Sequence, residues 1–122
     1  MSQVAEWIDA AIHNDDPRPL ITLGDVMVDV MQNRAAIMQG QRSCMVTRIA
    51  DYETTGERVM EAWLAGGDMG EIIAAVPQLE QIARASGCTQ AMVTGRRGWE
   101  RMLKPYGYAY SHTVLRKLLT HG

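Results

Sequence analysis

The chain has 122 residues, of which 47% are hydrophobic and 21% are charged, and its formal net charge is −2. This composition is typical of one folded domain that buries about two-thirds of the surface of its unfolded chain. The slightly acidic balance gives no reason to expect nucleic acid as a partner, because phosphate binding needs a clustered basic surface. The sequence also contains neither a long apolar run nor a secretion signal, so we expect no membrane association.

The N-terminal stretch 3–12 predicts a short amphipathic helix. Its apolar face is formed by Val4, Trp7, Ile8 and Ile12. Residues 13–19, HNDDPRP, then predict a linker, because each proline lacks a backbone N–H and restricts the residue before it. A small amphipathic helix on such a linker often docks on another surface, so Trp7 and Ile8 are candidate partner-binding residues.

The next part of the chain predicts a helix followed by a β-hairpin. Apolar positions recur at helical spacing from about residue 23 to residue 39, and Gly40 ends this helix. Residues 44–52 predict a strand, and the turn around Gly56 leads into a second strand over residues 58–64. We expect these two strands to pair antiparallel.

The stretch 58–87 is the centre of the expected fold, because its strand leads through a glycine turn into a helix. Asp68 is a typical N-cap, and Glu71 completes a capping box three residues later. Apolar residues then follow at helical spacing up to Gly87: Ile72, Ile73, Val76, Leu79, Ile82 and Ala83. Helix N-termini expose unpaired N–H groups, so this turn is either an anion site or a simple capped turn.

The remaining sequence predicts three short elements. Residues 89–94 predict a strand, residues 99–104 a short helix, and residues 108–119 a long last strand with alternating sides. Trp63 and Trp99 are expected to be largely buried. Neither the histidines nor the two cysteines, Cys44 and Cys88, have the spacing of metal ligands, so we expect no metal site and two reduced thiols.

From about residue 23 to residue 119 the order of elements resembles the GNAT (N-acetyltransferase) superfamily. The features that carry the resemblance are the hairpin, the glycine turn, the helix ending in ARASG, and the pair Gly107-Tyr108. The block GRRGWERMLKPYGY also resembles small GNAT-like proteins encoded in phages and prophages. The resemblance implies an α/β (α+β) fold with a mixed, mainly antiparallel sheet and helices on both faces. The chain then divides into an N-terminal helix with a Pro-containing linker (1–19) and a GNAT-like domain (20–122).

The sequence departs from the superfamily at its coenzyme loop, whose pattern is Gln/Arg-x-x-Gly-x-Gly/Ala. Counted back from Gly87, this loop falls on residues 67–72, so the resemblance assigns coenzyme binding to Gly67, Gly70, Glu71 and Ile72. Only Gly70 fits the pattern. Asp68 and Glu71 also place two negative charges where a pyrophosphate would lie, and these charges repel it.

No catalytic residue can be assigned from the sequence. The position at which the superfamily often has a general-acid tyrosine is occupied here by Leu103. Glu61 lies on the central strand, where exposed carboxylates are common, so it is not assigned as a base. Arg96, Arg97 and Arg101 are candidate partner-binding residues, and the alternative for them is a solvated helix face.

Two functions remain open. The sequence favours a GNAT-like phage or prophage protein that acts through protein contacts as a virion or assembly component. Such a protein has no cofactor, binds other virion proteins or itself, and lies in the bacterial cytoplasm or in the virion. The alternative is an acyl-CoA-dependent N-acyltransferase that uses acetyl-CoA despite an atypical phosphate-binding loop.

Overall fold

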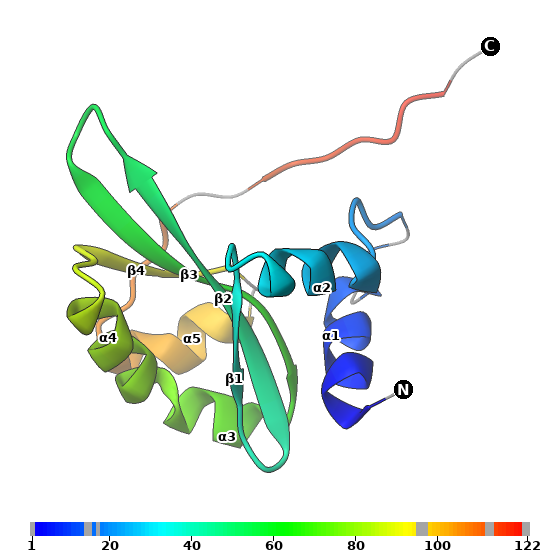
Figure 1. The fold of residues 1–122 in the computed structure, drawn as a ribbon, viewed down its shortest axis with the longest axis horizontal. Coiled ribbons are helices and arrows are strands. Elements are labelled where there is room, and N and C mark those ends of the chain that lie inside the picture. The colour runs from blue at the N-terminus through cyan, green and yellow to red at the C-terminus, as the bar shows by residue number, and fades with distance from the viewer. Residues whose placement is uncertain (1, 14–15, 17, 95–97, 112–113, 121–122) are drawn as a thin grey trace.

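The computed structural model describes residues 2–13, 16, 18–94, 98–111 and 114–120 (Figure 1). Four strands form one sheet in the order β1-β2-β3-β4. Their bounds are β1 (Ala36–Gln39), β2 (Ser43–Tyr52), β3 (Glu57–Gly67) and β4 (Gln90–Val93). The pairs β1–β2 and β2–β3 are antiparallel, and β4 runs parallel to β3. The predicted hairpin is therefore confirmed, with Gly56 at a φ of 76° in its turn.

Helices cover both faces of this sheet (Figure 1). One face carries α1 (Gln3–His13) and α2 (Leu23–Met31). The other carries α3 (Met69–Ala74), α4 (Val76–Ala85) and α5 (Gly98–Leu103), and the last of these continues into the short 3-10 helix η1 (Lys104–Tyr106). The fold class that the resemblance implied, a mixed and mainly antiparallel sheet between helices, is therefore confirmed.

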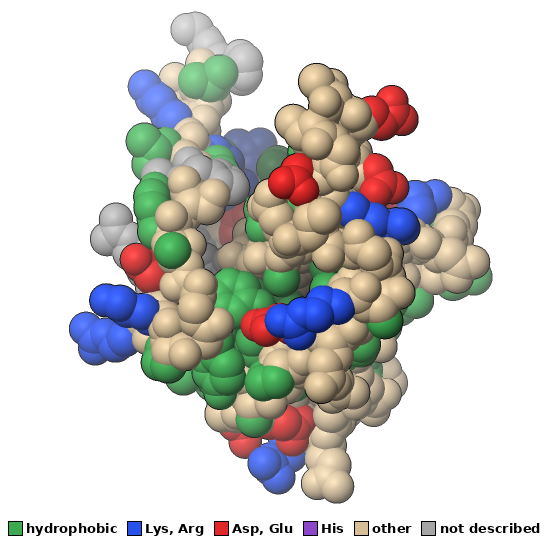
Figure 2. Space-filling view, turned by 90° about the vertical axis from the view of Figure 1, so that its left-hand side faces the viewer, with side chains coloured by type: hydrophobic (Ala, Val, Ile, Leu, Met, Phe, Trp, Pro, Cys, Tyr) green, Lys and Arg blue, Asp and Glu red, His purple; other side chains and the backbone are tan. Residues whose placement is uncertain are grey.

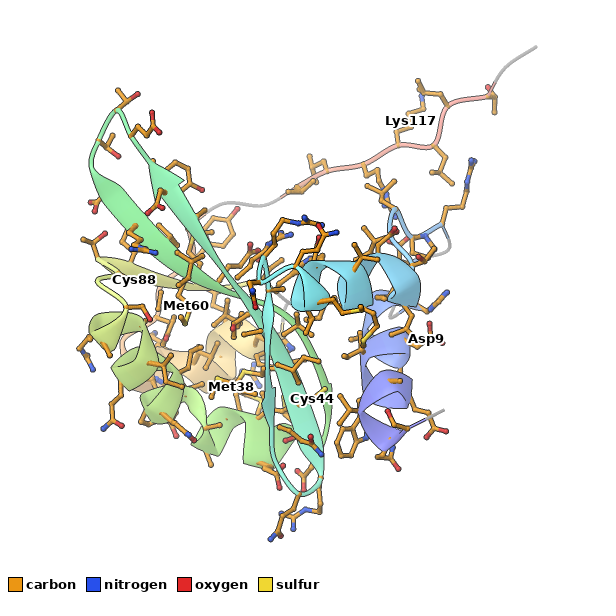
Figure 3. The ribbon with its side chains drawn as sticks, in the orientation of Figure 1. Asp9, Met38, Cys44, Met60, Cys88 and Lys117 are labelled. Atoms are coloured by element: carbon orange, nitrogen blue, oxygen red, sulfur yellow. The ribbon has the colours of Figure 1, made fainter. Side chains whose placement is uncertain are left out.

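The core has two halves because neighbouring residues of a strand point to opposite faces of the sheet. On β2, Cys44 and Val46 pack against α1 and α2, whereas Met45 packs with Leu79 of α4. All of these side chains are buried. Figure 3 shows Met60 and Cys44, which come from neighbouring strands and contribute to the two different halves.

The helix α1 packs on the sheet of its own chain. Ile8 and Ile12 are buried in the same cluster as Val26, Cys44 and Val46. The contact with β3 is close, because a Cβ atom added to Gly66 would lie 2.3 Å from the backbone carbonyl oxygen of Trp7. This helix therefore contributes to the core, whatever the role of the linker that follows it.

Three predicted elements are wrong in their extent. The second helix ends at Met31, because Asn33 takes a φ of 61° and Ala36–Gln39 pairs with β2 as a strand. The central helix is divided at Ala75 into α3 and α4, with Pro77 in the first turn of α4, where its missing N–H has little effect. The predicted last strand is absent, because residues 108–111 and 114–120 form no strand.

Within the described residues, no helix combines the length and the apolar character that crossing a membrane requires.

Candidate functional site

The parallel strands β3 and β4 separate after a short common run. Their pairing covers Val59–Ala62 and Gln90–Val93, and it ends where the Thr94 N–H donates to the Ala62 carbonyl at 3.1 Å. The strand β3 continues to Gly67. Beyond Ala62, its side towards β4 therefore has no strand partner among the described residues, and a fork opens in the sheet.

A β-bulge lies at the base of this fork. Val46 is opposite Leu64, whereas the next residue of β2, Thr47, is opposite Ala62, so Trp63 is the extra residue of β3. A bulge bends its strand and redirects side chains, and such bulges are common beside active sites. Here the bulge turns β3 at the residue after the last pairing with β4. No periodicity in the sequence signalled this bulge.

A small cavity of about 70 Å³ occupies the fork. Its walls include Trp63, Leu64 and Ala65 from β3, Val93 and Thr94 from the end of β4, and Trp99 from α5. Trp63 and Trp99 each have most of their surface covered and pack against buried core residues, as predicted, although neither is fully buried. Each has one surface in the core and another on this cavity. The lining is mostly apolar, which suits a slender acyl or alkyl group.

A polar cluster lies beside the fork. The Arg48 guanidinium stands 4.0 Å from the centre of the Trp63 ring and donates to the Glu61 carboxylate at 2.8 Å. The Thr94 hydroxyl donates to the other oxygen of the same carboxylate. Glu61 is thus fixed between two strands within reach of the fork. The sequence left it unassigned because exposed carboxylates are common on strands, and its partners Arg48 and Thr94 come from distant positions.

The hydrogen-bonding groups at the turn before α3 already have partners within the protein. The Asp68 carboxylate accepts from the backbone N–H groups of Gly70 at 2.9 Å and Glu71 at 3.4 Å. Arg42 donates to the other Asp68 oxygen at 3.0 Å. Gly67 has a φ of 103°, and a Cβ atom there would lie 2.3 Å from the Arg42 carbonyl oxygen. The N-cap prediction is confirmed, and the N–H groups of Gly70 and Glu71 are engaged by Asp68.

The predicted capping box is wrong, because Glu71 does not bond to the backbone of Asp68. Its carboxylate accepts from the Arg42 N–H at 3.0 and 3.2 Å and from the Ser43 hydroxyl. The Asp68 N–H donates to the Arg42 carbonyl at 2.8 Å instead. Glu71 therefore joins α3 to the β1–β2 turn. Ile72 is buried in the core, and the exposed Gly70 donates its N–H to the Asp68 cap, so each of the four predicted coenzyme residues has a role in the fold.

These bonds predict a dependence of stability on acid. The Ser43 hydroxyl and the Arg42 N–H hold the pKa of Glu71 below its ordinary value, and the Arg42 guanidinium does the same for the pKa of Asp68. A lowered pKa in the folded state means that the unfolded chain binds protons first, so this stabilisation is complete above about pH 5 and is lost on further acidification. We expect the unfolding free energy of Glu71→Gln to fall less than that of the wild type on acidification. The measurement is urea denaturation at a series of pH values. Glu53→Gln at the exposed hairpin turn is the control. If the unfolding free energies of the two variants depend on pH in the same way, Glu71 does not contribute to the acid dependence.

The other predicted site residues that the structure describes lie on different elements. Trp7 is half-buried. Ile8 is buried between α1 and the sheet, so it offers no surface to a partner. Arg101 is exposed on α5, whereas Arg96 and Arg97 lie outside the described residues. Leu103 is buried in the core. No group of metal-binding side chains occurs among the residues that the structure describes.

The sequence matches no model of a known protein family, and no curated protein matches it either. The structure is similar to that of an acetyltransferase from Trypanosoma brucei, with a TM-score of 0.64 and 15% identity over 94% of this chain and 89% of the other. A ribosomal-protein-alanine N-acetyltransferase from Brucella melitensis gives a TM-score of 0.57 and 16% identity over 90% and 88% of the two chains. An aminoglycoside acetyltransferase from an uncultured soil sample, solved with sisomicin, gives 0.58 and 8% over 94% and 84%. The chain therefore has a GNAT-like fold.

Proposed function

We propose that the protein binds an acyl thioester of coenzyme A in the fork between β3 and β4 and transfers the acyl group to an amine. The observation that carries this proposal is the separation of two parallel strands at a bulge, with an apolar cavity between them. The similarity to acetyltransferases over nearly the whole chain supports it. Fold alone does not fix activity, so the fork and not the similarity is the site to test.

The open side of β3 suits an extended ligand. Beyond Ala62 its backbone groups have no strand partner among the described residues, and a pantetheine arm carries amide groups that can bond to them as an added strand does. The thioester end then reaches the cavity beside Trp63 and Trp99. The apolar walls exclude water, which protects an activated acyl group from hydrolysis.

The pyrophosphate of the coenzyme has no matching site at residues 67–72. The N–H groups of Gly70 and Glu71 donate to Asp68, and Asp68 and Glu71 are both carboxylates. We therefore propose that binding rests on the pantetheine arm and the acyl group, with the phosphates directed into solvent. If the phosphates lie in solvent, residues 67–72 need not match the phosphate-binding pattern, and the thioester can still bind in the fork.

Glu61 is the proposed proton acceptor. Transfer forms an N–C bond and breaks the C–S bond, the attacking amine gives up a proton, and the coenzyme leaves as a thiolate that takes a proton from solvent. The Glu61 carboxylate is held beside the fork by Arg48 and Thr94, with its side chain 20% exposed, so an amine can reach it from solvent. Arg48 and Thr94 are positioning residues in this scheme.

We expect Glu61→Gln to lower kcat for acyl transfer to an amine by a factor of about 10² to 10⁴, with little change in acetyl-CoA affinity. The measurement is release of free thiol from acetyl-CoA over a panel of amines. Glu57→Gln, four residues earlier on β3 and away from the fork, is the matched control. Equal turnover for wild type and Glu61→Gln would remove Glu61 from the mechanism, and an absence of turnover in the wild type would contradict the proposed transfer.

A second function is favoured by the self-capped turn at α3. Asp68 occupies the N–H groups that an anion would need, which supports a scaffold that acts through protein contacts as a virion or assembly component. This function predicts no saturable acetyl-CoA binding and recovery of the protein with particles of a producing phage. Saturable binding at the fork would contradict it as stated.

A further inference from the structure

Two hollow spaces of the molecule share one stretch of wall. The cavity in the fork has a volume of about 70 Å³, and a larger groove of about 1120 Å³ runs beside β4, α4 and α5. Three residues line both spaces: Val93, Thr94 and Trp99. Figure 2 faces the side on which α4 and β4 lie and shows hydrophobic side chains gathered around a hollow. The three shared residues therefore stand between the fork and the groove.

The volume of the fork cavity limits the acyl group that it can hold. A cavity of about 150 Å³ binds benzene, which has six carbon atoms. The fork cavity has about half that volume, so it holds about three non-hydrogen atoms. An acetyl group has this size, and a propionyl group is one carbon atom larger. Longer acyl chains therefore need space beyond the cavity.

The inner walls of the fork cavity belong to the core. Leu79 and Val76 of α4 are 0% and 1% exposed, and Met45 of β2 is 3% exposed. Protein interiors are close-packed, so side chains buried in this way have no room to move away from a longer acyl chain. On the side of the groove, by contrast, empty space lies directly behind the shared wall.

Trp99 has the largest side chain of the shared wall. Val93 is fixed by its place on β4, where it pairs with Ala62, and the Thr94 N–H donates to the Ala62 carbonyl at 3.1 Å. Trp99 comes from α5 and packs against both core clusters on this face of the sheet. Its indole therefore supplies most of the bulk that closes the fork cavity towards the groove.

We propose that Trp99 determines which acyl groups the protein accepts, because its indole closes the fork cavity and restricts the acyl group to about two or three carbon atoms. This inference rests on the proposed thioester site and adds the class of acyl group that the site takes. Beyond the indole, Met92 and Leu103 give the groove apolar surface. A variant without the indole has space for a long acyl chain, and each methylene group that it buries raises the affinity about fourfold.

The test is calorimetric titration of acetyl-CoA, butyryl-CoA and octanoyl-CoA into wild type, Trp99→Leu and Trp7→Leu. The wild type is expected to bind acetyl-CoA at least about tenfold more tightly than octanoyl-CoA. In Trp99→Leu the two affinities should become equal or reverse, because the octanoyl chain enters the groove. Trp7→Leu is the matched control, since Trp7 is a partly exposed tryptophan of the other core half and lines neither space. It should keep the preference of the wild type.

Equal affinities of the wild type for acetyl-CoA and octanoyl-CoA would overturn the proposal, whether or not a Trp99 variant folds. An unchanged preference in Trp99→Leu, with the circular dichroism of the wild type, would also overturn it and would leave the thioester site in place. Trp99→Met, whose flexible side chain fills gaps in a core, is the second variant if Trp99→Leu does not fold. Failure of the wild type to bind any of the three ligands would contradict both this proposal and the thioester site.

Discussion

Replacing Ile8 by Ala is expected to lower the free energy of unfolding by about 2–5 kcal/mol. Ile8 is 1% exposed and packs with Val26, Cys44 and Val46, so truncation leaves a cavity between α1, α2 and the sheet. The measurement is urea denaturation followed by circular dichroism. Leu20→Ala is the control, because that side chain is 83% exposed and its loss should change stability by less than about 0.5 kcal/mol.

The stability of Ile8→Ala tests whether residues 1–19 are a unit separate from the rest of the chain. The sequence predicts a separate N-terminal helix and linker over residues 1–19, whose deletion leaves a folded domain. The burial of Ile8 and Ile12 in the core predicts instead that the deletion unfolds the chain. If Ile8→Ala is as stable as the wild type and the shortened chain folds, α1 is a separable element as the sequence suggests.

Gly67→Ala is expected to destabilise the fold more than Gly87→Ala, by about 1–3 kcal/mol. Both glycines have a positive φ, 103° and 79°, so both substitutions carry the same kind of backbone strain. At Gly67 the added Cβ also lies 2.3 Å from the Arg42 carbonyl oxygen, whereas nothing lies within 4 Å at Gly87. The difference between the two variants therefore measures the close approach of the β1–β2 turn.

Thermal and urea unfolding of the two alanine variants give this difference directly. Equal destabilisation would mean that the turn moves aside at no cost, and that Gly67 is needed only for its backbone angle. Either outcome also bears on the coenzyme loop, because Gly67 is its first position. A large difference means that this glycine is required by the fold itself, independently of any ligand.

Local signals in the sequence predicted the parts of the fold that depend on neighbours in the chain. Alternation and Gly56 gave the hairpin, and Asp68 gave the beginning of α3. The errors arose where distant residues decide. Glu71 could complete a capping box but bonds to Ser43 and Arg42, and the strand predicted over residues 108–119 does not form in its described parts, residues 108–111 and 114–120. Residues 36–39 continue a helical pattern but pair with β2.

The candidate site was predicted only in part. The sequence directed attention to residues 67–72, where the structure shows a turn bonded to itself. The fork depends on a bulge at Trp63 and on the departure of β4 after Val93, and both follow from the register between strands. A bulge inserts one extra residue and shifts the register, and the alternation of residues along one strand does not show where such an insertion falls. Glu61 became a candidate only when Arg48 and Thr94 were found beside it.

The most direct test of the central claim is calorimetric titration of acetyl-CoA and acetyl-pantetheine into three proteins: wild type, Ala65→Leu and Ala50→Leu. Ala65 lines the cavity, so a leucine there fills it, whereas Ala50 is exposed on β2 away from the fork. The account predicts saturable binding of both ligands to the wild type and to Ala50→Leu with similar affinities, because the phosphates have no site. It predicts at least about tenfold weaker binding to a folded Ala65→Leu. No binding to the wild type, or undiminished binding to Ala65→Leu, would contradict the claim that the fork holds the thioester.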